Sequence, residues 1–130
     1  PGQRCSAGSA DAFACLRAIP LNSTLAGATL DVLSASLENF GFSALYHDTG
    51  PPYSLSVDLA GDVRRARALL GAFKSDFDFQ EHLQQAFARP LDAHTRYHKP
   101  ACYNATFVQP VSLHLKLLGD EPVAYLEPSA

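Results

Sequence analysis

Val111-Ser112-Leu113-His114-Leu115-Lys116-Leu117 alternates apolar and polar residues at every step. This period of two puts the apolar side chains on one face of a β-strand and the polar ones on the other. Gly119-Asp120-Glu121-Pro122 has the composition of a turn, and Val123 to Leu126 returns as a second strand. Because a two-stranded hairpin alone is marginal in water, we expect it to belong to a sheet completed by strands elsewhere.

Upstream of Pro100 the apolar residues recur with a helical period of about 3.6. The pattern predicts four helices, separated by loops. They span 11–18, from Asn22 or Ser23 to Gly41, from Asp58 to about Phe73, and from Ser75 or Asp76 to Pro90. Their expected inward residues are Phe13, Leu16, Leu25, Leu30, Val32, Leu33, Leu37, Phe40, Val63, Ala66, Leu69, Leu70, Phe73, Phe79, Leu83, Ala86 and Phe87. Residues 42–56, rich in Pro and Gly, are expected to form a loop.

The predicted fold is therefore α+β and mainly α. A flexible tail covers 1–9, a four-helix N-terminal domain covers 10–100, and a β region covers 101–130. The chain starts with Pro1-Gly2 rather than Met and stops just after a strand-like run, so we expect both ends to be cut from a longer protein.

Size and charge narrow the classes of function. The chain has 130 residues, 47% hydrophobic content and a formal charge of −3, which suits one modest core and offers no basic field for nucleic acid. Arg64, Arg65 and Arg67 are expected on the solvated face of a helix. No run approaches the roughly 18 apolar residues that cross a bilayer.

Two sequons and three cysteines indicate the compartment. Asn22-Ser23-Thr24 and Asn104-Ala105-Thr106 both fit the acceptor pattern for N-glycosylation. With Cys5 and Cys15 near the start, they favour a secreted protein in which these two cysteines form a disulfide and Cys102 bonds to neither. The alternative is that all three are reduced thiols of a cytosolic protein.

The most distinctive segment is Leu91-Asp92-Ala93-His94-Thr95-Arg96-Tyr97, between the last predicted helix and the β region. An Asp two residues before a His can cap a turn and orient the imidazole. The residues alone leave two interpretations open: a structural turn with a satisfied His94, or an oriented functional base. His94 and His98 are four apart, but flanking prolines and the lack of a third ligand argue against a metal site.

The order of a helical domain, then Asp92-Ala93-His94-Thr95-Arg96-Tyr97, then a β region resembles the N-terminal part of tail-specific, or C-terminal-processing, serine proteases. Asp76-Phe77-Asp78-Phe79-Gln80 and the Cys15 to Thr24 stretch resemble more closely a eukaryotic branch related to the chlamydial protease-like activity factor. The resemblance covers roughly residues 11–126. It implies that the hairpin begins a PDZ-like domain.

The resemblance also implies which part of the protein supplies each catalytic group. In the family the catalytic Ser lies in a later domain. One branch serves it with a Lys and uses the Asp-x-His-Thr motif structurally, and the chlamydial type uses a His from the N-terminal part as general base. Only His94 matches that position, with Asp92 or Tyr97 beside it. No Ser here has a nucleophile setting, and a base without a nucleophile performs no acyl transfer.

The sequence therefore predicts an N-terminal fragment of a secreted serine endopeptidase, inactive alone and needing no cofactor. Its expected partners are a C-terminal catalytic fragment and, further, a peptide substrate or a second copy of the chain. The competing hypothesis is a non-catalytic extracellular module, for which the unfinished hairpin and Cys102 are suited to binding by strand addition.

Overall fold

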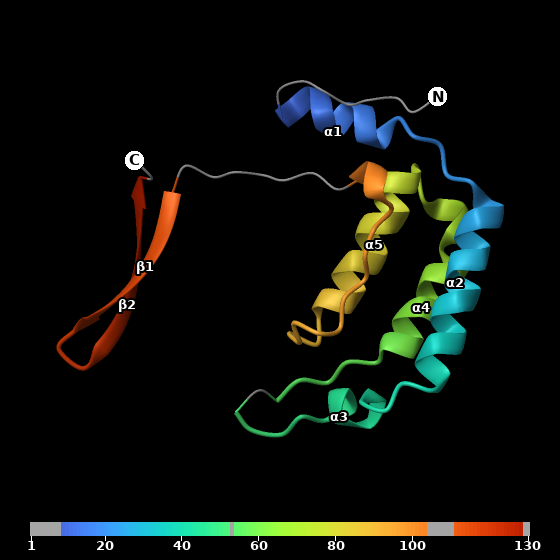
Figure 1. Ribbon diagram of the computed structural model, residues 1–130. Coiled ribbons are helices and arrows are strands. Elements are labelled where there is room, and N and C mark those ends of the chain that lie inside the picture. The colour runs from blue at the N-terminus through green and yellow to red at the C-terminus, as the bar shows by residue number, and fades with distance from the viewer. Residues whose placement is uncertain (1–8, 53, 104–110, 129–130) are drawn as a thin grey trace.

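The computed structural model describes residues 9–52, 54–103 and 111–128. Its elements in chain order are α1 (Ser9–Arg17), α2 (Ser23–Glu38), α3 (Ser43–His47), α4 (Leu59–Ala68), the 3-10 turn η1 (Leu70–Ala72), α5 (Asp76–Ala88), the 3-10 turn η2 (Ala101–Tyr103), β1 (Val111–Leu118) and β2 (Glu121–Pro128). The predicted α+β class, with helices first and a hairpin last, is confirmed (Figure 1).

Three helices begin where the sequence places a capping side chain. Asn22 Oδ1 accepts the backbone N–H of Leu25 at 3.1 Å and starts α2. Asp58 Oδ1 accepts from Gly61 at 2.7 Å and starts α4. Ser75 Oγ accepts from the N–H of Asp78, three residues on, at 3.1 Å and starts α5. Each cap satisfies one of the N–H groups that a helix start leaves unpaired.

The main core lies between α2, α4 and α5, which run beside one another in Figure 1. Its buried members are Ala26, Leu30, Tyr46, Val57, Leu59, Val63, Ala66, Phe79, Leu83, Ala86 and Phe87. A smaller cluster of Leu16, Phe77 and Tyr103 joins α1 and η2 to the start of α5. The apolar stripes predicted on α4 and α5 thus meet in one core, which removes their area from water.

Two expectations for the helical part are wrong. The part contains a fifth helix, α3, inside the segment expected to be a loop. Tyr46 explains it, because its ring is buried in the main core and packs at 5.6 Å from Phe40, so one helical turn is held by tertiary contact. Phe13, Leu25, Val32 and Leu69 are exposed rather than inward. Helix α1 packs on α5 and not on α2, so the outer stripe of α2 has no cover among the described residues.

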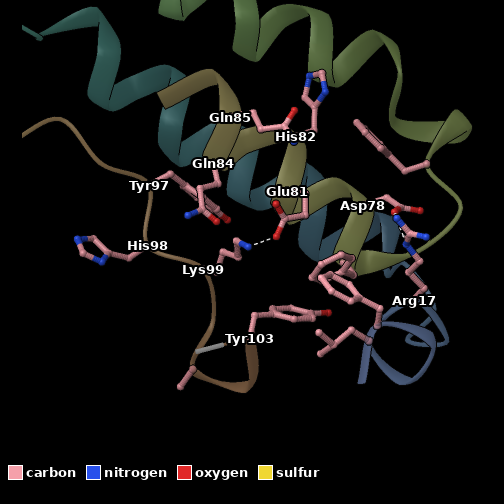
Figure 2. Close-up of a pocket in the computed structure, with 15 residues that line it drawn as sticks. Arg17, Asp78, Glu81, His82, Gln84, Gln85, Tyr97, His98, Lys99 and Tyr103 are labelled. Carbon is pink, nitrogen blue, oxygen red and sulfur yellow. Dashed lines mark hydrogen bonds and ion pairs between the residues drawn. The ribbon is translucent and has the colours of Figure 1, made fainter. Parts of the chain in front are cut away.

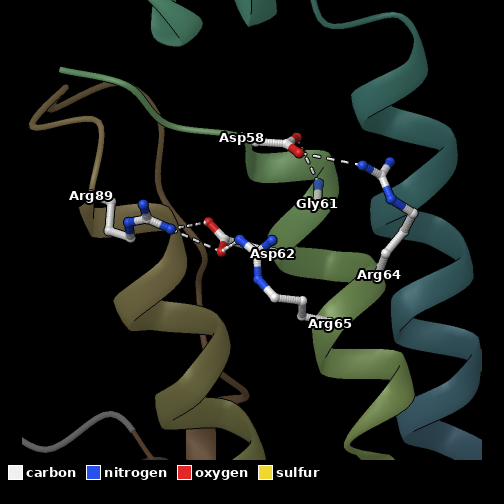
Figure 3. A network of polar contacts seen from close by, with 6 residues as sticks. All are labelled: Asp58, Gly61, Asp62, Arg64, Arg65 and Arg89. Atoms are coloured by element: carbon white, nitrogen blue, oxygen red, sulfur yellow. Dashed lines mark hydrogen bonds and ion pairs between the residues drawn. The ribbon is translucent and has the colours of Figure 1, made fainter.

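A polar network ties the end of α5 to α4 (Figure 3). The carboxylate of Asp62, nearly buried on α4, accepts two hydrogen bonds from Arg89 Nη1, at 2.9 and 2.7 Å. Arg65 pairs with the same carboxylate from the solvent side. Arg89 follows α5 directly, so this contact fixes the point from which the chain enters the 91–97 segment.

The hairpin is antiparallel and closed by a two-residue turn. Leu118 pairs with Glu121 and Val111 with Pro128, so Glu121 and Pro122 belong to β2 and not to the predicted turn, and β2 is longer than the predicted strand from Val123 to Leu126. Gly119 adopts φ +66°, which a side chain would strain and which two-residue hairpin turns require. All its residues are exposed except the half-buried Ser112. Nothing in the described residues extends the pair into the larger sheet that a PDZ-like domain needs, so that expectation stays a proposal.

Candidate functional site

A tight turn follows α5 at Leu91 to Thr95. Leu91 takes φ +56° and reverses the chain. Asp92 Oδ1 then accepts the backbone N–H of His94 at 2.9 Å, and the Asp92 carbonyl accepts the N–H of Thr95 at 3.3 Å. An Asp side chain that bonds the backbone two residues on is the usual device of such a turn. The structural half of the sequence interpretation, that Asp92 caps a turn, is thereby confirmed.

The other carboxylate oxygen of Asp92 is held by α3. The hydroxyl of Tyr46 donates to Asp92 Oδ2 at 2.6 Å, and that of Thr95 donates to the same oxygen at 2.9 Å. The bond from Tyr46, followed by the backbone N–H of His94, holds the pKa of Asp92 well below its ordinary value. Burial and the neighbouring Asp92 raise the pKa of Tyr46. At neutral pH this position is therefore a fixed carboxylate beside a neutral phenol.

The imidazole of His94 contacts this anchored carboxylate. Its Nδ1 lies 3.2 Å from Asp92 Oδ1, while 96% of its side chain is exposed. A proton on Nδ1 pointing at Asp92 leaves Nε2 as the accepting nitrogen. Among the described residues no group bonds Nε2. Asp92 therefore lies at one ring nitrogen of His94, and Nε2 opens to solvent and not into a cleft formed by the described residues.

Tyr97 does not join this pair. Its hydroxyl donates to Gln80 Oε1 of α5 at 2.6 Å, and its ring packs 6.0 Å from that of Phe87. It was expected as an alternative neighbour of His94, and its place is instead on the flank of the main core. Tyr97 therefore fixes the exit of the segment, as Asp92 fixes its entry.

A groove of about 950 Å³ lies beyond Tyr97, between α1, α5 and the 97–103 segment (Figure 2). Lys99 reaches across it to pair with Glu81 and lies 5.5 Å over the ring of Phe77. The hydroxyl of Tyr103 donates to Asp76 Oδ2 at 2.5 Å, and burial together with Asp76 raises the pKa of Tyr103. Sequence reasoning missed this groove, because the residues that pair in its walls are distant in the chain; Tyr103 and Asp76, for example, are 27 residues apart.

The remaining predicted site residues divide by position. Cys102 is free and exposed, so the expectation that it bonds to neither other cysteine is confirmed. Cys5 lies outside the described residues, and its pairing with Cys15 stays a prediction. Asn22 is exposed, whereas Asn104 also lies outside the described residues.

Metal and membrane features are not found in the described part of the chain. No three His, Cys, Asp or Glu side chains there are grouped closely enough to hold a metal ion. No helix described is long and apolar enough to span a bilayer. Comparisons with protein-family models, with curated proteins and with solved structures gave no match. The function is therefore argued from the geometry above.

Proposed function

We propose that this chain is the N-terminal helical domain of a secreted serine endopeptidase, in which His94 is the general base and Asp92 orients it. The observation that carries the proposal is the pair itself. Nδ1 of His94 faces a carboxylate that is anchored from α3, and Nε2 is open. A base in acyl transfer needs one nitrogen held and the other free to take the proton of a nucleophile.

The charge of Asp92 supports this role. A carboxylate that stays ionised stabilises the imidazolium formed when the base takes a proton. Tyr46 and Thr95 both bond to Oδ2 of Asp92 and fix the orientation of the carboxylate. Oδ1 is therefore the oxygen that faces Nδ1 of His94. A turn built only for structure would need the bonds to backbone and Tyr46, but not an imidazole aligned on the remaining oxygen.

The nucleophile belongs, in this proposal, to a C-terminal part of the same protein. Residues 1–130 alone then show no peptidase activity, since a base without a nucleophile cannot start acyl transfer. The hairpin would begin the PDZ-like domain between the two parts. Secretion would bring a glycan to Asn22 or Asn104 and a disulfide between Cys5 and Cys15, and the exposure of Asn22 is compatible with it.

The test uses the longer polypeptide that contains this segment, assayed on an unfolded protein substrate. We expect His94→Ala to lower kcat by orders of magnitude with the thermal transition unchanged. His98→Ala is the matched control, because His98 is also exposed and lies four residues away. Equal activity of the two variants, or activity that resists serine reagents, would refute the proposal.

A second function has its own support. The uncovered apolar face of the hairpin favours a non-catalytic extracellular module that binds through its β-strands. Purification separates the two functions. A companion fragment carrying a Ser that faces His94 supports the enzyme, whereas an unrelated partner supports the module.

A further inference from the structure

The two edges of the hairpin differ in their capacity for hydrogen bonds. In a two-residue hairpin the pair that closes the turn, here Leu118 and Glu121, exchanges ladder hydrogen bonds. Hydrogen-bonded and non-bonded pairs then alternate along an antiparallel ladder. The non-bonded pairs are therefore Leu117↔Pro122, Leu115↔Ala124, Leu113↔Leu126 and Val111↔Pro128. Their backbone groups point away from the partner strand, toward the free edges.

Because of this alternation, β1 can accept a further strand along its free edge, whereas β2 lacks some of the N–H groups that a further strand would need. On β1, four residues direct both an N–H and a C=O outward, and they are Val111, Leu113, Leu115 and Leu117. On β2, Pro122 and Pro128 occupy the two outermost of the corresponding positions, and proline has no N–H. Proline on an edge is a common device against further strand pairing. Only β1 therefore offers a full row of donors and acceptors.

The sequence of β1 is complementary to itself when the strand is reversed. A two-fold register that uses all four outward residues centres on His114. It pairs Val111 with Leu117 of a second copy, and Leu113 with Leu115 of that copy. On the polar face it sets Ser112 opposite Lys116, so no like-charged lysines meet. Val111, Leu113, Leu115 and Leu117 thus each face another apolar side chain.

We propose that β1 pairs antiparallel with β1 of a second copy of this chain, giving a four-stranded sheet centred on His114. The inference rests on the hairpin alone and does not depend on His94, but it takes the place of a PDZ-like sheet, whose further strands would need the same β1 edge. A hairpin is marginal by itself, while a four-stranded sheet with an apolar face has the strand number that independent stability needs. The prolines then end the sheet at β2 on both sides, so the assembly closes as a dimer and does not grow into a fibre.

The sharpest test is a disulfide at the two-fold axis, made in chains carrying Cys102→Ser to remove the exposed thiol. The two His114 residues form a non-bonded pair across the axis, where Cα atoms are about 4.5 Å apart and within reach of a disulfide. We expect His114→Cys to yield a crosslinked dimer under mild oxidation. Lys116→Cys is the matched control, because it lies on the same face but opposite Ser112, so the two new cysteines do not meet and the chain should stay without a crosslink.

A second measurement does not depend on these variants. In the unmodified chain, sedimentation should show twice the 14.0 kDa of one copy, with dissociation over about two decades of dilution. The backbone N–H groups of Leu113 and Leu115 should exchange more slowly in the dimer, and those of Ala124 and Leu126 should not change. Leu115→Pro should raise the dissociation constant at least about tenfold, while Ala124→Pro at its cross-strand partner leaves it within about twofold.

Three outcomes would overturn the proposal. These are a monomer at every concentration, equal crosslinking of the His114→Cys and Lys116→Cys chains, and slowed exchange at Ala124 and Leu126 in place of Leu113 and Leu115. A peptide or foreign protein occupying the β1 edge in place of a second copy would show the first of these. None of the results bears on the activity assay of His94, so the two proposals fail separately.

Discussion

The hairpin is richer in leucine than the helical part, yet only the helical part buries its apolar side chains. Leu30 and Leu83 are fully buried between α2, α4 and α5, whereas Leu113, Leu115 and Leu117 on β1 are each more than 65% exposed. The apolar faces of α2, α4 and α5 pack against one another within the helical part, because three helices can cover each other's apolar side chains. A two-stranded sheet has nothing to lay on its apolar face, so the same residue type stabilises one region and leaves the other in need of a partner.

The largest expected effect tests whether the core belongs to the helices alone. Phe79→Ala removes a fully buried ring and should lower the free energy of unfolding by about 3–5 kcal/mol, measured by urea denaturation. Leu115→Ala in the exposed hairpin should change it by less than about 0.5 kcal/mol in dilute solution. A comparable loss from the Leu115 change would mean that the hairpin is part of the same cooperative core.

The next effect concerns the polar link between α4 and the end of α5. Asp62→Ala leaves Arg89 without its two hydrogen bonds and should cost about 1–3 kcal/mol. Arg64→Ala, which removes an exposed pair with Asp58, should cost no more than about 0.5 kcal/mol. Thermal unfolding of the two variants measures this. A larger loss of stability from Arg64→Ala than from Asp62→Ala would contradict the prediction.

A single helix cap, Ser75 at the start of α5, is expected to have a smaller effect on stability. Ser75→Ala removes the buried acceptor for the N–H of Asp78 and should destabilise the chain by about 1 kcal/mol. Ser36→Ala, which removes only an exposed hydrogen bond to the Val32 carbonyl within α2, supplies the control, with a smaller change expected in the same denaturation experiment. If the cap were dispensable, Ser75→Ala would unfold at the same urea concentration as the parent chain.

Acid should weaken the 91–95 turn, and the direction follows from Asp92. Its folded pKa is lowered, so its contribution to stability is complete above the ordinary value near 4 and is lost as pH falls below it. Tyr46→Phe removes the main cause of the lowering, so the loss in acid should be smaller and should be complete at a higher pH. Thermal unfolding between about pH 2 and 7 measures this. Identical acid limbs for the two proteins would contradict the assignment.

The smallest expected effect is at the candidate base itself. His94→Ala should change stability by less than about 0.5 kcal/mol, because the ring is almost fully exposed and only Asp92 touches it among the described residues. Urea denaturation tests this. A loss above about 1 kcal/mol would show that His94 is structural and would remove the reason to assign it a catalytic role.

Local signals were the ones that sequence reasoning could use. The caps at Asn22, Asp58 and Ser75 and the alternation of β1 each depend on neighbours within a few residues, and all four predictions are confirmed. The turn at Asp92 belongs to the same group, because its first hydrogen bond spans only two residues.

The features that sequence reasoning predicted wrongly or missed depend on contacts between residues distant in the chain. Helix α3 is held by the burial of the Tyr46 ring in the main core and by its bond to Asp92, 46 residues further on, and neither contact can be read from the segment itself. Leu25 and Val32 satisfy the helical period, yet periodicity cannot tell which face another helix will cover. The groove beside Lys99 has no motif at all, since its walls come from three separate stretches.

The Lys99–Glu81 pair has a practical consequence for labelling chemistry. Only 16% of the Lys99 side chain is accessible, and its amine is engaged by a carboxylate above an aromatic ring. The other two lysines, Lys74 and Lys116, are exposed. An amine-selective dye should therefore acylate Lys74 and Lys116 first. One reports from the helices and the other from β1, so a donor and an acceptor attached there would read the separation of the two regions by energy transfer without any added cysteine.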